Sequence, residues 1–220
     1  MRLILVRHGQ TKSNVRHIID TATPGPGLTK LGRQQADALP AALAAEQVDA
    51  IYASTLVRTQ QTAAPLCAAR DLAPRVRAGI REIEAGDFEG KRDKTSVHDF
   101  VSTELSWVRG DLDRAMPGGQ TGRETLARFD DVVAEAEAAG HSRVVFVSHG
   151  SMIRTWSGAR ASNVDVEFVY RNPLNNTGVV VLDGTMASGW TVLAWQDRAM
   201  GPGLDDEGAS GAVADDSRLD

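Results

Sequence analysis

The chain has 220 residues, of which 42% are hydrophobic and 24% charged, which suits one globular domain or one domain followed by a tail. Its net charge of −5 argues against nucleic acid as the main partner, and its single cysteine, Cys67, excludes an internal disulfide and a cysteine-rich metal site. No apolar stretch approaches the ~20 residues of a membrane-spanning helix, and the first residues lack the layout of a signal peptide. We therefore expect a cytoplasmic protein with no membrane partner.

The first predicted strand ends in a charged pair. Residues 3–6 are all apolar, which is typical of a strand buried on both faces of a parallel sheet. Arg7 and His8 follow at its carboxyl end, where open α/β sheets bind their ligands. Gly9 is expected to let the backbone turn tightly and come close to a ligand. On these residues alone, a surface arginine beside an incidental histidine is the alternative interpretation.

The next segment, residues 11–29, is polar and rich in turn-forming residues, which predicts a long functional loop that contains Asn14. Apolar residues at helical spacing then predict a helix over about 31–43, with Thr29 as its cap. Pro40 lies inside this pattern and is expected to kink or split the helix.

A second short strand is predicted over residues 48–53, and a helix over about 56–69 follows it. Arg58 falls in the first turn of this helix, where the helix dipole disfavours a cation unless an anion shares the site. A merely exposed arginine is the alternative. Residues 75–78 are a candidate third strand, and the turn-rich, acidic segment 81–90 would be a solvated loop on its charge alone.

The second half of the chain continues the alternation of helices and strands. Helices are predicted over about 95–109, 126–136 and 152–158, and the strand at 143–147 runs directly into Ser148-His149-Gly150. Residues 179–182 and 190–195 predict two closing strands at the sheet edge, joined at Asp183-Gly184. From residue 201 the chain is rich in Gly and Asp, so we expect a domain over 1–200 and a disordered acidic tail over 201–220.

Strands that alternate with helices predict an α/β fold, a three-layer sandwich with a mostly parallel central sheet and helices on both faces. The carboxyl ends of parallel strands meet at one edge of such a sheet. That edge would gather Arg7, His8, the turn at 54–58, the Glu82 loop and His149. Two histidines, two arginines and an acid rarely gather by accident, so we expect a functional site there.

The residue types favour phosphoryl transfer. The sequence lacks histidine or cysteine pairs at metal-ligand spacing and lacks glycine-rich nucleotide motifs, so we expect neither a metal nor a cofactor. Guanidinium groups match phosphate oxygens, and a neutral imidazole is a good nucleophile toward phosphorus. A carboxyl group protonates a departing alcohol. The set fits phosphoryl transfer through a phosphohistidine.

The sequence resembles the histidine phosphatase superfamily, also called phosphoglycerate mutase-like, as far as about residue 182. The matching segments occur in the family's order and form a highly specific series: Arg7-His8-Gly9-Gln10-Thr11 with Asn14, residues 28–36, residues 54–63, Glu82-Ile83 with residues 86–90, Pro117-Gly118-Gly119 and Ser148-His149-Gly150. The resemblance implies the phosphoglycerate mutase-like fold and a metal-independent phosphatase acting on a small phosphorylated metabolite.

The resemblance also implies a role for each matched residue. His8 would attack phosphorus and become phosphorylated. Arg7, Arg58 and His149 would hold the non-bridging oxygens and spread the charge of the transition state. Asn14 would donate a hydrogen bond to the same oxygens.

Two further assignments come from the same resemblance. Gly150 is expected to bind phosphate beside His149. Glu82 matches the family's proton donor, with Glu84 as a nearby competitor, and it would act as the base when water attacks the phosphohistidine.

The chain departs from the family at Gln10, where Glu is common, at Phe88, where Trp is common, and at Gln120-Thr121, where Glu-Ser is common. We expect the first and last to bear on substrate contacts or pocket charge. A cofactor-dependent phosphoglycerate mutase is the second interpretation, although the longer insertion and Arg-His-Tyr-Gly segment of such mutases are not visible between residues 90 and 117. A non-catalytic phosphate-binding module is the third. The natural substrate and the oligomeric state stay open.

Overall fold

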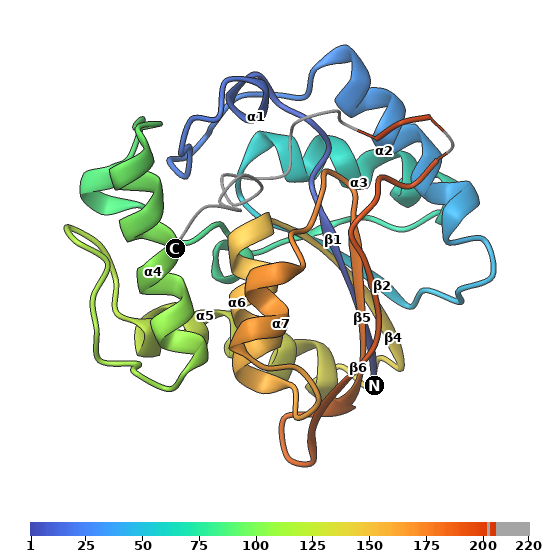
Figure 1. Cartoon of the computed structure of the whole chain (residues 1–220). Coiled ribbons are helices and arrows are strands. Elements are labelled where there is room, and N and C mark those ends of the chain that lie inside the picture. Colours follow the sequence, from blue (N-terminus) through green and yellow to red (C-terminus); the bar gives the residue numbers. More distant parts are fainter. Residues whose placement is uncertain (202, 206–220) are drawn as a thin grey trace.

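A computed structural model describes residues 1–201 and 203–205, and these form a three-layer α/β sandwich (Figure 1). Within them the sheet has six strands in the order β3-β2-β4-β1-β5-β6. The strands are β1 (Arg2–Arg7), β2 (Ala50–Ala53), β3 (Arg75–Val76), β4 (Arg143–Ser148), β5 (Val179–Thr185) and β6 (Gly189–Gln196). The first four run parallel, and β5 and β6 close one edge as an antiparallel hairpin, as predicted.

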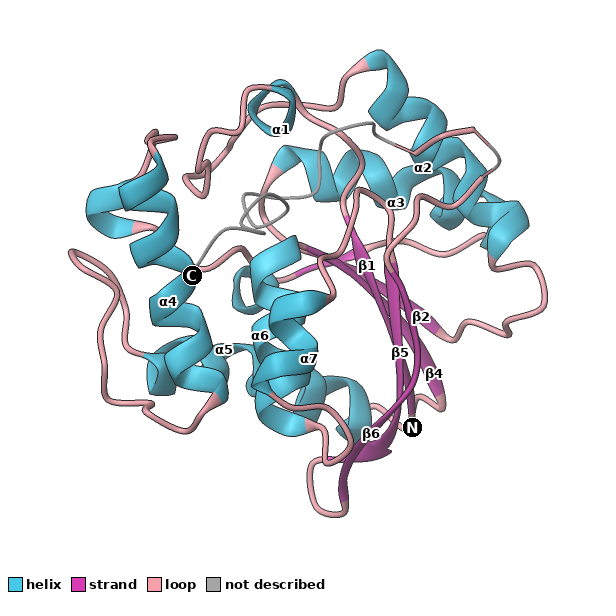
Figure 2. Cartoon of the chain, in the orientation of Figure 1, coloured by secondary structure: helices cyan, strands magenta, loops and turns pink. Residues whose placement is uncertain are grey.

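Helices cover both faces of the sheet (Figure 2). One face is covered by α2 (Lys30–Ala42) and α3 (Val57–Arg70), and the other by α5 (Gly122–Ala138) and α6 (Gly150–Arg160). Two more helices, α4 (Lys94–Val108) and α7 (Val166–Arg171), pack against α6. The loops hold the short helix α1 (Lys12–Val15) and the 3-10 turns η1 (Ala78–Ile80) and η2 (Gly86–Phe88).

The central strands are apolar throughout because their side chains alternate between two hydrophobic cores. In β1, Leu3 and Leu5 belong to the core beneath α5 and α6, while Ile4 and Val6 belong to the core beneath α2 and α3. All four side chains are fully buried. Because both faces of β1 are buried, its side chains serve packing, and the residues that can contact a ligand follow at its carboxyl end.

Three local predictions need correction. Helix α2 runs through Pro40 without splitting, because Pro40 lies in the last turn and only two helical residues follow it. Strand β5 continues through Asp183-Gly184, and the turn occupies residues 186–188. Glycine is needed at 184 because a Cβ there would lie 2.2 Å from the carbonyl oxygen of Gly189 on β6. The loop at 11–29 begins with α1, and α7 lies in a segment with no predicted helix.

The close approach at Gly9 also differs from the expectation. A Cβ at this position would lie 2.5 Å from the carbonyl oxygen of Gly32 in α2, so the small residue admits a neighbouring helix rather than a ligand.

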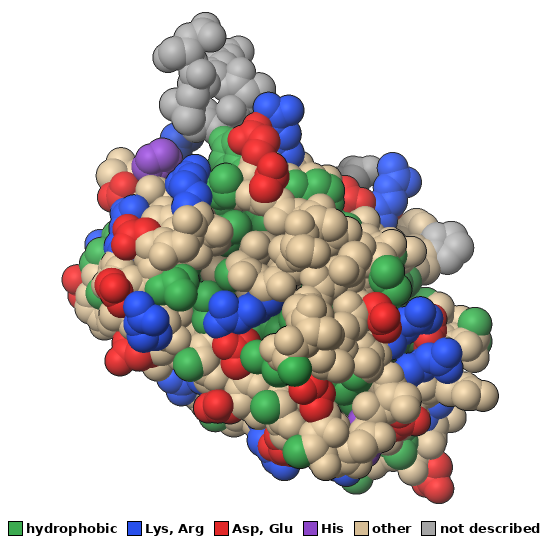
Figure 3. Space-filling model, turned by 90° about the horizontal axis from the view of Figure 1, so that it is seen from below, with side chains coloured by type: hydrophobic (Ala, Val, Ile, Leu, Met, Phe, Trp, Pro, Cys, Tyr) green, Lys and Arg blue, Asp and Glu red, His purple; other side chains and the backbone are tan. Residues whose placement is uncertain are grey.

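The amino terminus lies at the end of the molecule opposite the carboxyl ends of the parallel strands. The surface there has interspersed basic and acidic side chains (Figure 3). Among the described helices, none has both the length and the apolar character needed to cross a membrane. The predicted acidic tail lies outside the described residues, apart from its first few. There the carbonyl of Leu204 accepts a hydrogen bond from Gln35 at 2.9 Å.

Candidate active site

The carboxyl ends of β1 and β4 bring the two predicted histidines together. Arg7 pairs with Ser148 in the parallel ladder, so His8 and His149 each lie one residue beyond paired strand ends. Their ring centroids are 5.2 Å apart and the ring planes meet at 63°. Both residues are almost fully buried, with exposed fractions of 3% and 0%.

The His8 ring presents an unprotonated Nε2. Arg58 Nε donates to this atom at 3.1 Å, and because a guanidinium only donates, the ring proton must lie on Nδ1. Nδ1 in turn donates to the carbonyl of Gly9 at 2.8 Å. Burial, together with Arg58 and Arg7, lowers the pKa of His8 well below its ordinary value. The ring is therefore neutral, as a nucleophile requires.

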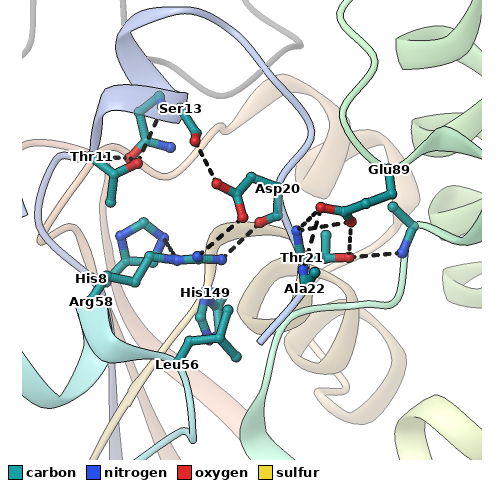
Figure 4. A network of polar contacts seen from close by, with 12 residues as sticks. His8, Thr11, Ser13, Asp20, Thr21, Ala22, Leu56, Arg58, Glu89 and His149 are labelled. Carbon is teal, nitrogen blue, oxygen red and sulfur yellow. Dashed lines mark hydrogen bonds and ion pairs between the residues drawn. The ribbon is translucent and has the colours of Figure 1, made fainter. Parts of the chain in front are cut away.

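Arg58 lies in the first turn of α3, as predicted, and is 3% exposed. Its Nη2 donates to the carbonyl of Asp20 at 2.8 Å, and its Nη1 lies 3.6 Å from Asp20 Oδ1 (Figure 4). Burial lowers the pKa of Arg58, and the Asp20 carboxylate offsets this effect. Asp20 thus supplies an anion beside this arginine from within the chain.

Arg7 is 5% exposed, and its Nη1 donates to the carbonyl of Leu174 at 2.5 Å. A Cβ at position 150 would lie 3.1 Å from Arg7 Nε. Gly150 therefore lets this guanidinium lie directly against the first turn of α6, where backbone N–H groups and the helix dipole favour an anion.

The His149 ring is hydrogen-bonded to Ser54, whose Oγ lies 2.8 Å from His149 Nε2. Nδ1 on the other side of the ring is buried and has no hydrogen-bond partner among the described residues. Burial, followed by the charge of Arg58, lowers the pKa of His149 well below its ordinary value, so the ring is neutral.

The side chain of Asn14 is oriented by hydrogen bonds to its carbonyl oxygen. Oδ1 accepts from Thr11 N at 2.9 Å, from Thr11 Oγ1 at 3.0 Å and from Asn176 Nδ2 at 3.3 Å. Because Oδ1 takes these donors, Nδ2 is the atom left to donate to a ligand.

Glu82 lies in the loop between η1 and η2, and its side chain reaches the first turn of α6. Its Oε1 accepts from Met152 N at 2.9 Å, and its Oε2 accepts from Ser151 N at 3.4 Å. The backbone carbonyl of Glu82 accepts from Arg128 at 2.8 Å. Its competitor Glu84 pairs with Arg81 and lines a separate hollow.

Most of the predicted site residues line one cavity of about 110 Å³. Six of the seven line it directly: Arg7, His8, Asn14, Arg58, Glu82 and Gly150. His149 lies against the His8 ring without lining the cavity. Gln10 and Gln120, the departures from the family pattern, do not line it either; Gln10 accepts a hydrogen bond from Thr29 at 2.6 Å and Gln120 accepts one from Arg128 at 3.2 Å.

Several further polar residues of the same region were not among the predicted site residues. Asp20 lines the cavity from the loop that carries Asn14, and no motif or periodicity in the sequence marks it as a site residue. Arg154 lines the cavity four residues after Gly150, a helical spacing that would have found it. Glu104 on α4 is 3% exposed, and burial raises its pKa to about 8. The described residues include no group of three or more His, Cys, Asp or Glu side chains placed to hold a metal ion.

A neutral imidazole between two buried guanidiniums, at the carboxyl edge of an α/β sheet, is the arrangement expected of a phosphoryl-transfer enzyme. Residues 3–198 match the family model of the histidine phosphatase superfamily (branch 1). The chain belongs to that superfamily, as its motifs predicted.

Two mycobacterial proteins illustrate the relationship. The glucosyl-3-phosphoglycerate phosphatase of Mycobacterium tuberculosis is 30% identical over 90% of this chain and 95% of its own length. The PE-PGRS family protein PE_PGRS11 of the same organism is 36% identical over 90% of this chain, which spans only 36% of that longer protein.

A solved structure shows the same fold. The mycobacterial glucosyl-3-phosphoglycerate phosphatase in complex with VO3 superposes with a TM-score of 0.74 at 30% identity, over 89% of this chain and 98% of that one. The phosphoglycerate mutase-like α/β sandwich predicted from the sequence is thereby confirmed.

Proposed function

We propose that this phosphatase hydrolyses phosphate monoesters of small organic alcohols through a phosphohistidine on His8. The observation that carries the proposal is the neutral Nε2 of His8, unprotonated and facing the guanidinium of Arg58 inside the cavity. The phosphatase relatives support the reaction class.

In the first half-reaction, the phosphate group of the substrate takes over the Nε–H of Arg58, which frees the lone pair of His8 Nε2. Nε2 attacks phosphorus, the bond to the ester oxygen breaks, and Glu82 gives its proton to the departing alcohol. Arg7, Arg58 and His149 stabilise the charge on the non-bridging oxygens.

In the second half-reaction, water attacks phosphorus and the bond to His8 Nε2 breaks. Glu82, now ionised, takes a proton from the water, and inorganic phosphate leaves. Apart from His149, which packs against the His8 ring, the groups that act in both half-reactions line the cavity, and the proposed steps involve no metal ion.

Purified protein should hydrolyse p-nitrophenyl phosphate in the presence of EDTA, and His8→Ala should abolish the activity. With 3-phosphoglycerate and 2,3-bisphosphoglycerate it should form little 2-phosphoglycerate. Inactivity on a broad panel of phosphomonoesters would favour a binding module, and rapid interconversion of the phosphoglycerates would make the protein a mutase.

The role of Glu82 has its own test. Glu82→Gln should slow the hydrolysis of alkyl phosphates more than that of p-nitrophenyl phosphate, because only a poor leaving group needs the proton. Equal losses on both substrates would move the proton donor to another residue. The cytoplasmic location and the 1–200 domain boundary remain predictions.

A further inference from the structure

The loop at 11–29 holds the Arg58 side chain through two different atoms of Asp20 (Figure 4). The main-chain carbonyl of Asp20 accepts from Arg58 Nη2 at 2.8 Å, and the carboxylate Oδ1 lies 3.6 Å from Nη1. With these two nitrogens held on the loop side, Nε is the nitrogen that faces His8 Nε2, at 3.1 Å. Asp20 therefore determines which edge of the guanidinium faces the nucleophile.

The orientation matters because phosphorus must come within about 3–3.5 Å of His8 Nε2 before it reacts. The Nε–H of Arg58 already points to that place, so it is the donor that a phosphoryl oxygen meets first. An arginine side chain has many rotamers, and a fixed partner restricts them before the substrate arrives, so less entropy is lost on binding.

Asp20 is itself held in place. Ser13 Oγ donates to Asp20 Oδ2 at 2.5 Å. The adjacent residue, Thr21, donates to the carboxylate of Glu89 through its backbone N at 3.0 Å and through Oγ1 at 2.6 Å. Thr21 Oγ1 also accepts from Ala85 N at 3.1 Å.

These contacts connect the loop at 11–29 with the segment at 81–90, which carries Glu82 (Figure 4). The contacting residues lie more than sixty positions apart in the chain, and Thr21 among them lines the cavity. Glu89 is thus linked by hydrogen bonds to Thr21, and the adjacent residue Asp20 is linked by hydrogen bonds through Arg58 to His8.

We infer that Asp20 is a positioning residue of the phosphatase: it acts on the reaction through Arg58, and Glu89 fixes the loop from which it does so. The inference rests on the proposed function, because it assumes that Arg58 binds the transferred phosphoryl group. It assigns to Asp20 no contact with the reacting atoms.

A double-mutant cycle tests this inference. Asp20→Asn keeps the main-chain carbonyl that accepts from Arg58 but removes the carboxylate that pairs with Nη1. It should lower kcat/KM for p-nitrophenyl phosphate about 5- to 30-fold and weaken inhibition by inorganic phosphate by a similar factor, since residues of one ion-pair network are coupled. In the Arg58→Gln background the same substitution should change kcat/KM less than about twofold, because coupled residues are not additive.

Two further variants serve as controls. Glu89→Gln leaves Asp20 intact and should give a smaller loss in the same direction, about two- to fivefold, again absent without Arg58. Asp37→Asn, an exposed aspartate on α2, should leave kcat/KM and phosphate inhibition unchanged. Melting temperatures show whether each variant is folded.

The outcomes distinguish failure of the positioning role of Asp20 from failure of the proposed function. An equal loss from Asp20→Asn with and without Arg58, or no loss in either background, would overturn the positioning role. A rise in activity would show that Asp20 competes with phosphate and would overturn it as well. Failure of the unmodified protein to hydrolyse any phosphomonoester would instead reject the proposed function.

Discussion

The two walls of the active-site cavity are built in different ways. One wall comes from the end of β1, which carries His8 and is supported by His149 at the end of β4; both strands are buried on both faces. The other comes from the loops at 11–29 and 81–90 and from α4, which are held by hydrogen bonds such as that of Thr21 to Glu89. The difference suggests that the nucleophile sits on the rigid wall, and that the side chains that orient its partners sit on the adjustable one.

Burial shifts pKa values in opposite directions on the two walls, and on both it favours the uncharged form of the side chain. On the strand-end wall it lowers the pKa of His8 and of His149, so both bases stay neutral. On the α4 wall it raises the pKa of Glu104 to about 8, so this acid also stays neutral. The cations Arg7 and Arg58 therefore stand among uncharged histidines, which suits a dianionic ligand.

The largest expected effect on activity concerns Arg58, which contacts His8 on one wall and Asp20 on the other. Arg58→Gln should lower kcat about 10²- to 10³-fold, because removal of one donor to a charged transition state typically costs that much. Steady-state hydrolysis of p-nitrophenyl phosphate measures it. Arg70→Gln, in the last turn of the same helix, is the matched control and should keep near-normal activity. A loss below tenfold would remove Arg58 from the phosphoryl site.

Glu104 on the α4 wall should make the free energy of unfolding fall as the pH rises. Because the folded protein keeps the Glu104 proton up to about pH 8 while the unfolded chain releases it near 4.5, the free energy of unfolding falls as pH rises between these values. Glu104→Gln should remove this loss, so the stability of the variant relative to the unmodified protein should rise by about 4 kcal/mol between pH 5 and pH 8.5. Urea unfolding at pH 5 and pH 8.5 measures it. Equal differences between the two proteins at both pH values would contradict the prediction.

His149, at the end of β4, should make the free energy of unfolding fall as the pH decreases. His149 is neutral when folded but protonates near pH 6.5 when unfolded, so its contribution to stability is lost as pH falls below 6.5. His149→Gln should reduce the fall in unfolding free energy between pH 6.5 and 5.5 by about 1 kcal/mol. Urea titrations at the two pH values provide the comparison, and an unchanged slope would mean that His149 is charged in the folded state.

The strand-end wall is the part that could be predicted from sequence. Continuous apolar runs at 3–6 and 143–147 are read reliably as buried parallel strands, and the rule for their carboxyl ends then places His8 and His149. The same logic fails for Gly184, because a glycine that admits a neighbouring strand is indistinguishable in sequence from one that makes a turn.

The loop wall could not be derived in this way. Asp20 and Glu89 act through contacts between segments far apart in the chain, and isolated acidic residues in polar loops have no periodicity. Glu104 lies on a helix that was predicted, yet its burial depends on how α4 packs against α6. Tertiary packing, which local sequence does not encode, decides these roles.

The most direct test of catalysis through His8 is to trap the phosphoenzyme. After brief reaction with a ³²P-labelled phosphomonoester, an alkaline quench that preserves phosphohistidine and peptide mapping should place the label on His8. The label should be absent in His8→Ala and should accumulate when hydrolysis of the intermediate is slowed. Label on another residue, or full turnover by His8→Ala, would contradict the account.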